Sequence, residues 1–268
     1  MQKKKDQYYL IGNPAKHSLS PTIHKYFANQ YKQSMSYDIL ELSPRSFQDV
    51  FIELKNTPTV KGLSITVPFK EKAFSLVDRK DPLALSSQSI SNVVFLSDRT
   101  SLGLNLDGLG LIRDLKKKQI YLKDKSILII GAGGAAHGIL TSIANELPKT
   151  VTIANRTQAK ANNLVTKFKE TININSSSLD KISDSYDLII NATSASIEDK
   201  MLPISPENFN KNAIGYDLMY TKNGTIFTKW CYKNNIDSYD GLGMLLELSS
   251  EIFKIWRGIT PSYNNIII

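Results

Sequence analysis

The segment at 126–138, SILIIGAGGAAHG, limits the possible fold of this chain more than any other stretch. An apolar, partly β-branched run ends in closely spaced glycines, and a helix-forming stretch follows. Gly131 suits a tight turn, Gly133 a close approach of the backbone to a pyrophosphate, and Ala136 the packing of helix on strand. The segment therefore predicts a Rossmann-type dinucleotide site, with the phosphates at the amino end of the helix.

The end of the next strand-like run, VTIAN, indicates which dinucleotide is bound. An NAD site usually carries an acidic residue here, which binds the ribose 2′-hydroxyl. This chain has Asn155, Arg156 and Thr157 instead, with Lys160 one helical turn further on. A guanidinium can hold a 2′-phosphate through two hydrogen bonds, whereas a carboxylate would repel it. The pattern favours NADP over NAD, the alternative being that Arg156 is a plain surface charge.

Strand-like and helix-like runs alternate along the chain, which is typical of α/β folds with mostly parallel sheets. We expect the principal helices at 21–33, 44–55, 69–77, 107–118, 134–146, 157–169 and 241–257. The runs fall into two sets. We therefore expect a first domain at 1–106 that is completed by 241–268, and a dinucleotide-binding domain at 107–240.

Composition restricts the environment and the partners of the protein. The 268 residues carry a formal net charge of +8, and the single cysteine, Cys231, is typical of a reducing compartment. The run YYLI is too short for a signal sequence, and no run reaches the ~20 apolar residues of a membrane helix. Lysine clusters at 3–5 and 116–118 lack interleaved aromatic residues. We expect a cytoplasmic protein, monomeric or homodimeric, that binds a small molecule and neither nucleic acid nor membranes.

Two segments of the first domain place ionisable and polar residues after strand-like runs. GLSITVPFKEKA contains Thr66 and Lys70, and GLNLDGLG contains Asn105 and Asp107. Oxidation of an alcohol needs a base at the hydroxyl proton while hydride leaves the carbon, and a desolvated lysine can serve. A neighbouring aspartate would then chiefly orient the lysine and relay the proton. By spacing alone, each of these residues is more often a surface charge.

Several blocks occur in the order found in shikimate dehydrogenases, and the resemblance spans almost the whole chain. The blocks are GNPAKHSLSPTIH, GLSITVPFKEKA, GLNLDGLG, GAGGAAHG, ANRT, NATS, YDLMY and DGLGML. The resemblance implies an α/β fold in which a substrate-binding domain faces an NADP-binding Rossmann domain across a cleft. It also implies the reversible, NADPH-dependent reduction of 3-dehydroshikimate to shikimate in aromatic amino acid (chorismate) biosynthesis.

The resemblance assigns roles to individual positions. It makes Lys70 and Asp107 the catalytic pair on the reacting oxygen. The implied substrate ligands are Ser18 and Ser20 for the carboxylate, Thr66 and Tyr220 for the ring substituents, and Ser91, which stands where the family has an asparagine. The implied cofactor-binding residues are Gly131, Gly133, Gly134, Ala135, Asn155, Arg156, Thr157, Thr193, Ser194, Met219 and Gly241. Ordinary strand-end and turn chemistry is the alternative for the last four.

The loop GNPAKHSLSPTIH explains why two serines stand close together after the first strand. In an extended segment, side chains two residues apart point the same way, so Ser18 and Ser20 can present two hydroxyls to one carboxylate. Pro21 suits the first turn of the helix that follows. His17 and His24 lack a third ligand at metal spacing, and we expect no metal site.

The departures from the family pattern lie on the substrate side. Ser64 and Ser91 replace asparagines, Leu106 replaces a threonine, and Leu248 replaces a glutamine expected to bind substrate. Loss of a partner for a buried substrate hydroxyl costs about 1–3 kcal/mol per site. Two other activities therefore stay open: dehydrogenation of another hydroxylated ring acid, of quinate or aminoshikimate type, and NADP binding without turnover. Retention of the lysine and aspartate pair argues against a pure binding protein.

Overall fold

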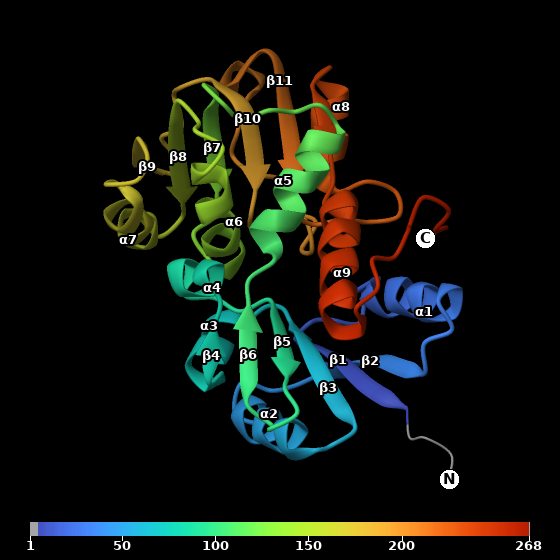
Figure 1. Ribbon diagram of the computed structural model, residues 1–268. Helices are drawn as coiled ribbons and strands as arrows, with labels where there is room; N and C mark the ends of the chain where they lie inside the picture. The colour runs from blue at the N-terminus through green and yellow to red at the C-terminus, as the bar shows by residue number, and fades with distance from the viewer. Residues whose placement is uncertain (1–4, 268) are drawn as a thin grey trace. The chain divides into compact units, whose positions relative to one another are not determined.

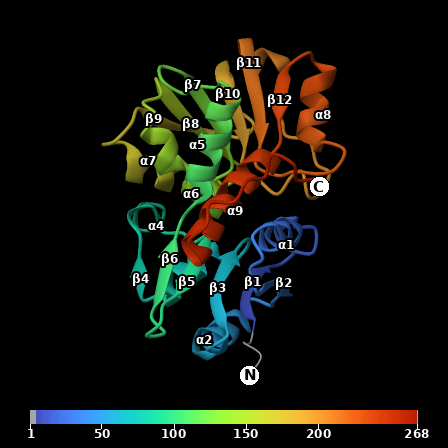
Figure 2. The same cartoon turned by 45° about the vertical axis from the view of Figure 1, so that its right-hand side comes forward.

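The computed structural model describes residues 5–267, and the chain divides into two compact units (Figures 1 and 2). The first unit runs to Gly110 and resumes at Leu245, and the residues between them form the second. Both divisions fall inside helices, α5 (Asp107–Lys117) and α9 (Leu242–Arg257). Among the described residues, no helix has the length and apolar content that crossing a membrane requires.

The first unit is built on a mixed six-stranded sheet in the order β2-β1-β3-β5-β6-β4. Its strands are β1 (Asp6–Gly12), β2 (Met35–Glu41), β3 (Val60–Ile65), β4 (Arg79–Lys80), β5 (Asn92–Phe95) and β6 (Ser101–Leu104). Its helices, besides its parts of α5 and α9, are α1 (Ser20–Gln30), α2 (Phe47–Asn56), α3 (Lys70–Leu76) and α4 (Pro82–Ser87). The α/β class predicted from the sequence is confirmed.

The hairpin of β5 and β6 departs from the mostly parallel arrangement that the sequence predicts. β5 runs antiparallel to both β3 and β6, while β1 pairs in parallel with β2 and β3. The chain reverses in a tight turn, where the Leu96 N–H donates to the Thr100 carbonyl over 2.9 Å. So short a connection joins antiparallel strands. Consequently β3 and β6 run in the same direction, and their carboxyl ends meet at one edge of the sheet.

Helices cover both faces of this sheet, and each face has its own apolar core. On one face, side chains from α2, β3, β5 and the start of α3 pack together, among them Phe47, Phe51, Leu63, Phe69 and Val93. On the other face, β1, α1 and α9 contribute Tyr8, Leu10, Ile23, Phe27 and Phe253. Because both faces are buried, the central strands are almost continuously apolar rather than alternating.

The second unit has a parallel six-stranded sheet in the order β12-β11-β10-β7-β8-β9. Its strands are β7 (Ser126–Ile130), β8 (Thr150–Asn155), β9 (Ile174–Ser178), β10 (Tyr186–Asn191), β11 (Phe209–Asp217) and β12 (Asp237–Tyr239). Its own helices are α6 (Gly134–Ala144), α7 (Gln158–Phe168), the short η1 (Pro206–Asn208) and α8 (Ile226–Lys233). The strand order reverses beside β7, which is where such sheets bind ligands beyond the carboxyl ends of their strands. The Rossmann arrangement predicted for this part of the chain is confirmed.

Candidate active site

The strongest candidate for the reacting group is an ion pair between Lys70 and Asp107. Lys70 opens α3 just beyond β3, and Asp107 opens α5 just beyond β6. The common direction of β3 and β6 brings the two side chains together, and Lys70 Nζ donates to Asp107 Oδ2. The side chains are 13% and 4% exposed, so water has little access to the pair. A lysine held in this way can give a proton to a substrate oxygen or take one from it.

A buried amide holds the turn that carries Asp107. The Asp107 N–H donates to Asn105 Oδ1 over 3.1 Å. Asn105 Nδ2 donates to Ser87 Oγ and to the Ser89 carbonyl, each over 3.0 Å. Because Asn105 is only 1% exposed, these bonds do not compete with bulk water. The Asn105 side chain therefore helps to set the direction in which the chain leaves β6.

The two serines of the first loop lie together, although by a different geometry from the one expected. Ser18 Oγ donates to Ser20 Oγ over 3.1 Å, and the Ser20 N–H donates to Ser18 Oγ over 3.2 Å. The expectation of an extended segment is wrong, because Leu19 has helical backbone angles, φ −83° and ψ −5°. The chain has already turned into α1, and Pro21 occupies its first turn as predicted. The hydroxyls therefore converge at a helix start rather than along a strand.

The loops after β1 and β3 are joined at the same edge of the sheet. The Asn13 N–H donates to the Val67 carbonyl over 2.8 Å, and the Thr66 N–H donates to the Ile11 carbonyl over 2.9 Å. Gly12 lies so close to the second loop that an added Cβ would come within 2.3 Å of Thr66 Cγ2. These contacts keep Thr66 beside the serine loop and the start of α3.

Ser91, expected to bind substrate, has its hydroxyl engaged by the protein. The hydroxyl accepts from the Leu106 N–H over 2.8 Å and donates to Asn92 Oδ1 over 2.9 Å. Asn92 Nδ2 donates to Ser64 Oγ over 3.0 Å. The three polar side chains are at most 7% exposed. Two of the departures from the family pattern, Ser64 and Ser91, thus belong to one buried chain of hydrogen bonds.

The other two departures, Leu106 and Leu248, lie in one apolar cluster. Leu106 packs with Leu104 and Ile252, and Leu248 packs against the same group. A polar residue at only one of the two positions would face an apolar neighbour, which is unfavourable when buried. Because Leu106 directly precedes Asp107, apolar surface adjoins the ion pair.

In the second unit, the glycine loop joins β7 to α6 at the switch point of the sheet. Gly131 has φ +115°, and an added Cβ would lie 2.8 Å from the Ala192 carbonyl oxygen, so only glycine suits this turn. Gly133 is the N-cap of α6, and an added Cβ there would meet no described atom within 4 Å. Open space therefore lies over the amino end of this helix, whose first turn contains Gly134 and Ala135. This arrangement suits the pyrophosphate of a dinucleotide.

The end of β8 carries the residues expected to select the dinucleotide. Asn155 Nδ2 donates to the Thr157 carbonyl over 2.9 Å, which shapes the turn into α7. Arg156 is exposed in this turn. The pKa of the Glu198 carboxyl is lowered chiefly by a hydrogen bond from Lys200 and, to a smaller extent, by the positive charge of Arg156. Arg156 can therefore contact a 2′-phosphate from solvent, with Glu198 as a nearby competing anion.

Two buried polar residues outside the predicted set shape the loops after β10 and β11. Asn191 Oδ1 accepts from the N–H and the hydroxyl of Thr193, over 3.0 and 2.7 Å. Asn191 Nδ2 donates to Asp217, which also accepts from the Met219 N–H over 3.0 Å. Burial raises the pKa of the Asp217 carboxyl. Their signal in the sequence is a polar residue that ends an apolar strand, as in DLIIN and IGYD. Ser194, next in the first of these loops, is exposed.

Gly241 contacts the loop after β11. An added Cβ at Gly241 would lie 2.2 Å from the Leu218 carbonyl oxygen, and the Gly241 N–H donates to the Met219 carbonyl over 2.9 Å. A close approach of two backbone segments therefore requires this glycine. Tyr220 follows the same loop and is partly buried. Of the predicted substrate ligands, Tyr220 belongs to the second unit and the others to the first.

The two histidines of the first loop and helix lie in different surroundings. His24 is buried and stacks on Tyr37 with ring centroids 4.2 Å apart, and burial lowers its pKa to about 3. His17 is exposed. Within residues 5–267, no group of three or more histidine, cysteine or acidic side chains could hold a metal ion.

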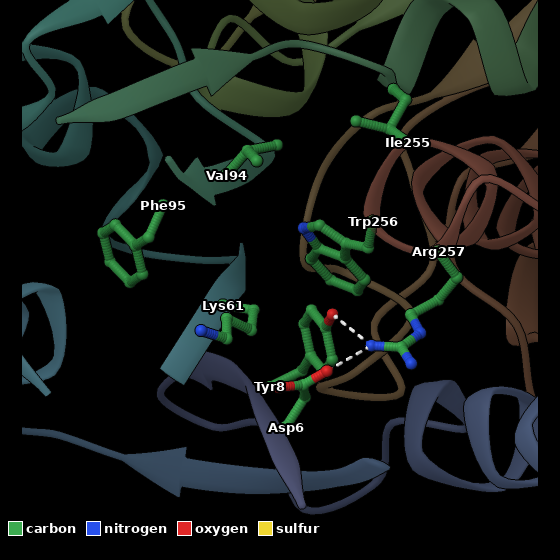
Figure 3. Close-up of a pocket in the computed structure, with 8 residues that line it drawn as sticks. All are labelled: Asp6, Tyr8, Lys61, Val94, Phe95, Ile255, Trp256 and Arg257. Carbon is green, nitrogen blue, oxygen red and sulfur yellow. Dashed lines mark hydrogen bonds and ion pairs between the residues drawn. The ribbon is translucent and has the colours of Figure 1, made fainter. Parts of the chain in front are cut away.

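A pocket of about 180 Å³ lies at the amino ends of β1 and β3, the edge of the sheet opposite the ion pair (Figure 3). Its lining residues are Asp6, Tyr8, Lys61, Val94, Phe95, Ile255, Trp256 and Arg257. Arg257 Nη1 donates to Asp6 over 2.6 Å and to the Tyr8 hydroxyl over 3.3 Å, and Nε donates to Gln33 over 3.0 Å. The guanidinium is thus already committed to protein partners, so we assign this pocket no role in the reaction.

Comparisons with known proteins find relatives over nearly the whole chain. The family described as shikimate dehydrogenase substrate binding domain matches residues 10–94, and the family described as shikimate / quinate 5-dehydrogenase matches residues 114–205. The NADP-dependent shikimate dehydrogenase of Aeromonas hydrophila is 37% identical over 98% of this chain and 96% of its own. Among solved structures, shikimate dehydrogenase from Aquifex aeolicus matches with a TM-score of 0.88 and 31% identity, covering 98% of this chain and 96% of that one. The structure of shikimate 5-dehydrogenase from Thermus thermophilus, in complex with NADP(H) and shikimate, matches with a TM-score of 0.85 and 26% identity. The match covers 96% of this chain and 95% of that one.

Proposed function

The chain belongs to the shikimate dehydrogenase family, and we propose that it interconverts 3-dehydroshikimate and shikimate with NADP(H) in the biosynthesis of aromatic amino acids. As a member of this family it is an NADP-dependent oxidoreductase that acts on a CH–OH group. The observation that carries the proposal is the shielded ion pair of Lys70 and Asp107. A protein that only bound NADP would not need such a pair. The pair also lies beyond the carboxyl ends of strands, where α/β sheets bind ligands.

NADP is the cofactor, and residues of the second unit fit it. When bound, NADPH supplies the hydride that reduces the substrate carbonyl. The amino end of α6 offers backbone N–H groups to the pyrophosphate, and Gly133 leaves room above them. Arg156 is exposed where a guanidinium can bind the 2′-phosphate, which NAD lacks. We assign Asn155, Thr157 and the loops after β10 and β11 to the remaining cofactor contacts.

Lys70 moves the proton of the reaction. During reduction, the Lys70 ammonium gives a proton to the carbonyl oxygen of 3-dehydroshikimate. During oxidation, the neutral amine takes the proton of the shikimate hydroxyl. Asp107 accepts a hydrogen bond from Lys70 Nζ, which aims the amine at the substrate oxygen. The Lys70 side chain keeps 13% exposure, through which the amine can regain its proton from solvent, or release it, between turnovers.

The serine loop supplies an anchor for the substrate carboxylate. The hydroxyl oxygens of Ser18 and Ser20 are 3.1 Å apart, so each can donate to one carboxylate when their mutual hydrogen bond is given up. Thr66 lies in the neighbouring loop and can contact a ring hydroxyl. A carboxylate held at the serines and an oxygen held at Lys70 would orient the ring between them.

Substitution of Lys70 tests the proposal. Lys70→Met should lower NADP-linked oxidation of shikimate about a thousandfold, because general acid–base catalysis is lost. NADPH affinity, measured by fluorescence titration, should change less than about twofold, since the cofactor loops are untouched. Lys72→Met on the same helix is the matched control and should retain activity. Undiminished turnover by Lys70→Met would refute the assigned role.

A second candidate function, dehydrogenation of another hydroxylated ring acid, is favoured by one observation. Leu106 and Leu248 form an apolar cluster beside Asp107 where the family pattern has polar residues. Such a surface suits a substrate whose polar groups are placed differently from those of shikimate. Comparison of kcat/KM for shikimate, quinate and an aminoshikimate in one absorbance assay decides between them. NADPH-induced stabilisation without turnover of any of the three would favour a protein that only binds the cofactor.

A further inference from the structure

Ser91 and Leu106 lie where the regular sheet stops, next to the proposed catalytic pair. The ladder between β5 and β6 ends with the pairing of Asn92 and Leu104. One residue further, the Ser91 N–H donates to the Leu104 carbonyl over 2.9 Å. The Leu106 N–H then donates to Ser91 Oγ over 2.8 Å rather than to a strand carbonyl. A side-chain hydroxyl thus takes the place of a backbone acceptor at the point where the chain leaves the sheet.

The Leu106 backbone determines the direction of the hydrogen bonds in this group. Because an N–H can only donate, Ser91 Oγ must accept there, and its single proton goes to Asn92 Oδ1, 2.9 Å away. The Leu104 carbonyl, at 3.5 Å, is a weaker alternative acceptor. Asn92 then presents Nδ2 to Ser64 Oγ, 3.0 Å away. Ser64 and Asn92 are directly opposite each other in the pairing of β3 and β5, so the strand register holds the far end of this chain.

Leu106 connects this chain of hydrogen bonds to Asp107. Its carbonyl accepts from the Gly110 N–H over 2.9 Å in the first turn of α5. Its side chain is 5% exposed in the apolar cluster described above. The next residue, Asp107, donates its own N–H to Asn105 over 3.1 Å. Rotation of the backbone at Leu106 would therefore turn the Asp107 carboxylate away from Lys70.

We propose that Ser91 is a positioning residue, which holds the Leu106 backbone so that Asp107 faces Lys70, while Asn92 and Ser64 hold the Ser91 hydroxyl. The proposal rests on the proposed function of Lys70 and Asp107 in proton transfer. It differs from the expected substrate contact of Ser91, because one hydroxyl proton cannot serve Asn92 and a substrate oxygen at once. It also gives a reason for Ser64 and Ser91 to depart from the family pattern together.

The variants Ser91→Ala and Ser91→Thr test this role. Alanine removes the acceptor of the buried Leu106 N–H, and kcat for shikimate oxidation should fall about tenfold because a catalytic group is slightly misplaced. KM for shikimate should change less than about twofold, since the interaction is not with the substrate. Threonine keeps the hydroxyl and should restore most of kcat. If Ser91→Ala does not fold, Asn92→Ala tests the same role, because it keeps the Ser91 hydroxyl but removes the side chain that holds it. A lower kcat with unchanged KM in Asn92→Ala would support the positioning role of Ser91. An unchanged kcat would overturn it.

Ser101→Ala is the matched control for a buried serine on the same hairpin. Ser101 is 0% exposed at the opposite end of β6, where its hydroxyl donates to Asp78. Its loss should lower thermal stability and leave kcat, KM and the pH profile unchanged. Ser91→Ala behaving like Ser101→Ala would show a purely structural role and overturn the proposal. A raised KM with unchanged kcat would show direct substrate binding and overturn it as well.

Labelling of Lys70 separates this proposal from the proposed function. Acetic anhydride modifies a free amine, and mass spectrometry gives the extent of Lys70 modification at one fixed pH. Asp107 holds the amine through a hydrogen bond, so loss of that alignment should increase Lys70 modification in Ser91→Ala but not in Ser101→Ala. This result in a protein that does not oxidise shikimate would support the positioning role while refuting the function. An unchanged extent of labelling would overturn the positioning role even in an active enzyme.

Discussion

The two units build their proposed binding sites from different materials. In the second unit, the phosphate loop depends on the backbone: Gly131 makes the turn, Gly133 leaves open space, and a helix end supplies N–H groups. In the first unit, the Lys70–Asp107 pair depends on side chains that are 37 residues apart in the sequence. A backbone site is contained in one short segment, whereas a side-chain site needs a defined strand order. For this reason the phosphate loop of the second unit is visible as a sequence motif, and the ion pair of the first unit is not.

The departures from the family pattern follow the same division. They lie in the first unit, where Ser64 and Ser91 share a chain of hydrogen bonds and Leu106 and Leu248 share an apolar cluster. Side chains in contact can change as a set and remain satisfied. The phosphate loop has no such freedom, because φ at Gly131 is +115° and a side chain at Gly133 would fill the space above the helix end. The substrate end can therefore diverge while the cofactor loop stays the same.

The largest effect that separates the two units is expected from Asp107→Asn. The neutral amide cannot form the ion pair that aims Lys70, so kcat for shikimate oxidation should fall about a thousandfold. NADPH affinity should be unchanged, because the cofactor loops are in the other unit. Stopped-flow kinetics and fluorescence titration measure the two quantities. The control is Asp98→Asn, in the exposed turn between β5 and β6. An equal loss of kcat in both variants would show that Asp107 has no specific role in the reaction.

Arg156→Ala tests the cofactor side alone. Loss of charged hydrogen bonds to the 2′-phosphate should weaken NADP binding about tenfold to a hundredfold. NAD binding should hardly change, since NAD has no such phosphate. Isothermal titration of both cofactors gives the ratio. Equal loss for NADP and NAD would show that Arg156 supports the fold of the loop rather than the phosphate.

Two glycine variants sharpen the argument about the backbone. Gly133→Ala should fold normally, because its Cβ would meet no described atom within 4 Å, yet weaken NADPH binding about tenfold by filling the pyrophosphate space. Gly131→Ala should instead lower the melting temperature, since φ is +115° and the Cβ would approach the Ala192 carbonyl. Calorimetry with and without NADPH distinguishes the two. Unchanged NADPH affinity in Gly133→Ala would show that the pyrophosphate does not bind above Gly133.

His24 makes the stability of the first unit fall as the pH is lowered below neutrality. Burial lowers its pKa to about 3, while an unfolded histidine titrates near 6.5. Between these values the unfolded chain binds a proton that the folded chain does not, so stability falls as the pH is lowered. At pH 5 the loss relative to pH 7 should be about 2 kcal/mol, by urea unfolding. His24→Phe should abolish this part of the slope, and His17→Asn, at an exposed site, should leave it intact. If the free energy of unfolding of His24→Phe fell equally between pH 7 and pH 5, other groups would be responsible for the pH dependence.

The smallest effect is expected from Glu198→Gln. The exposed Glu198 carboxylate competes with the 2′-phosphate for the positive charge of Arg156. Its removal should therefore strengthen NADP binding about twofold at low salt. The gain should disappear at high ionic strength, because exposed charges are screened. Titration of NADP at two salt concentrations measures both. A gain that persists at high salt would indicate a change in loop structure rather than in charge.

The sequence predicts the elements of the fold better than their pairing. The helices at α1, α6 and α9 follow from local patterns, and each is present. The antiparallel course of β5 was not predicted, because its short apolar runs resemble the neighbouring parallel strands. The meeting of Ser18 and Ser20 was predicted correctly but for the wrong reason, since Leu19 is helical. Local patterns carry no information on where a helix begins to within one residue.

Features that depend on neighbouring residues follow from local patterns in the chain: the strand, turn and helix around Gly131, the basic end of β8, and the alternation of strands and helices. Which distant side chains meet follows only from the folded arrangement. Lys70 contacts Asp107 because β5 runs antiparallel between β3 and β6, so that β3 and β6 run in the same direction. Ser91 contacts the Leu106 N–H because the β5–β6 ladder ends at the pair of Asn92 and Leu104. The physical reason is that backbone conformation is set within a few residues, whereas side-chain contacts depend on strand order and register, which the whole core determines.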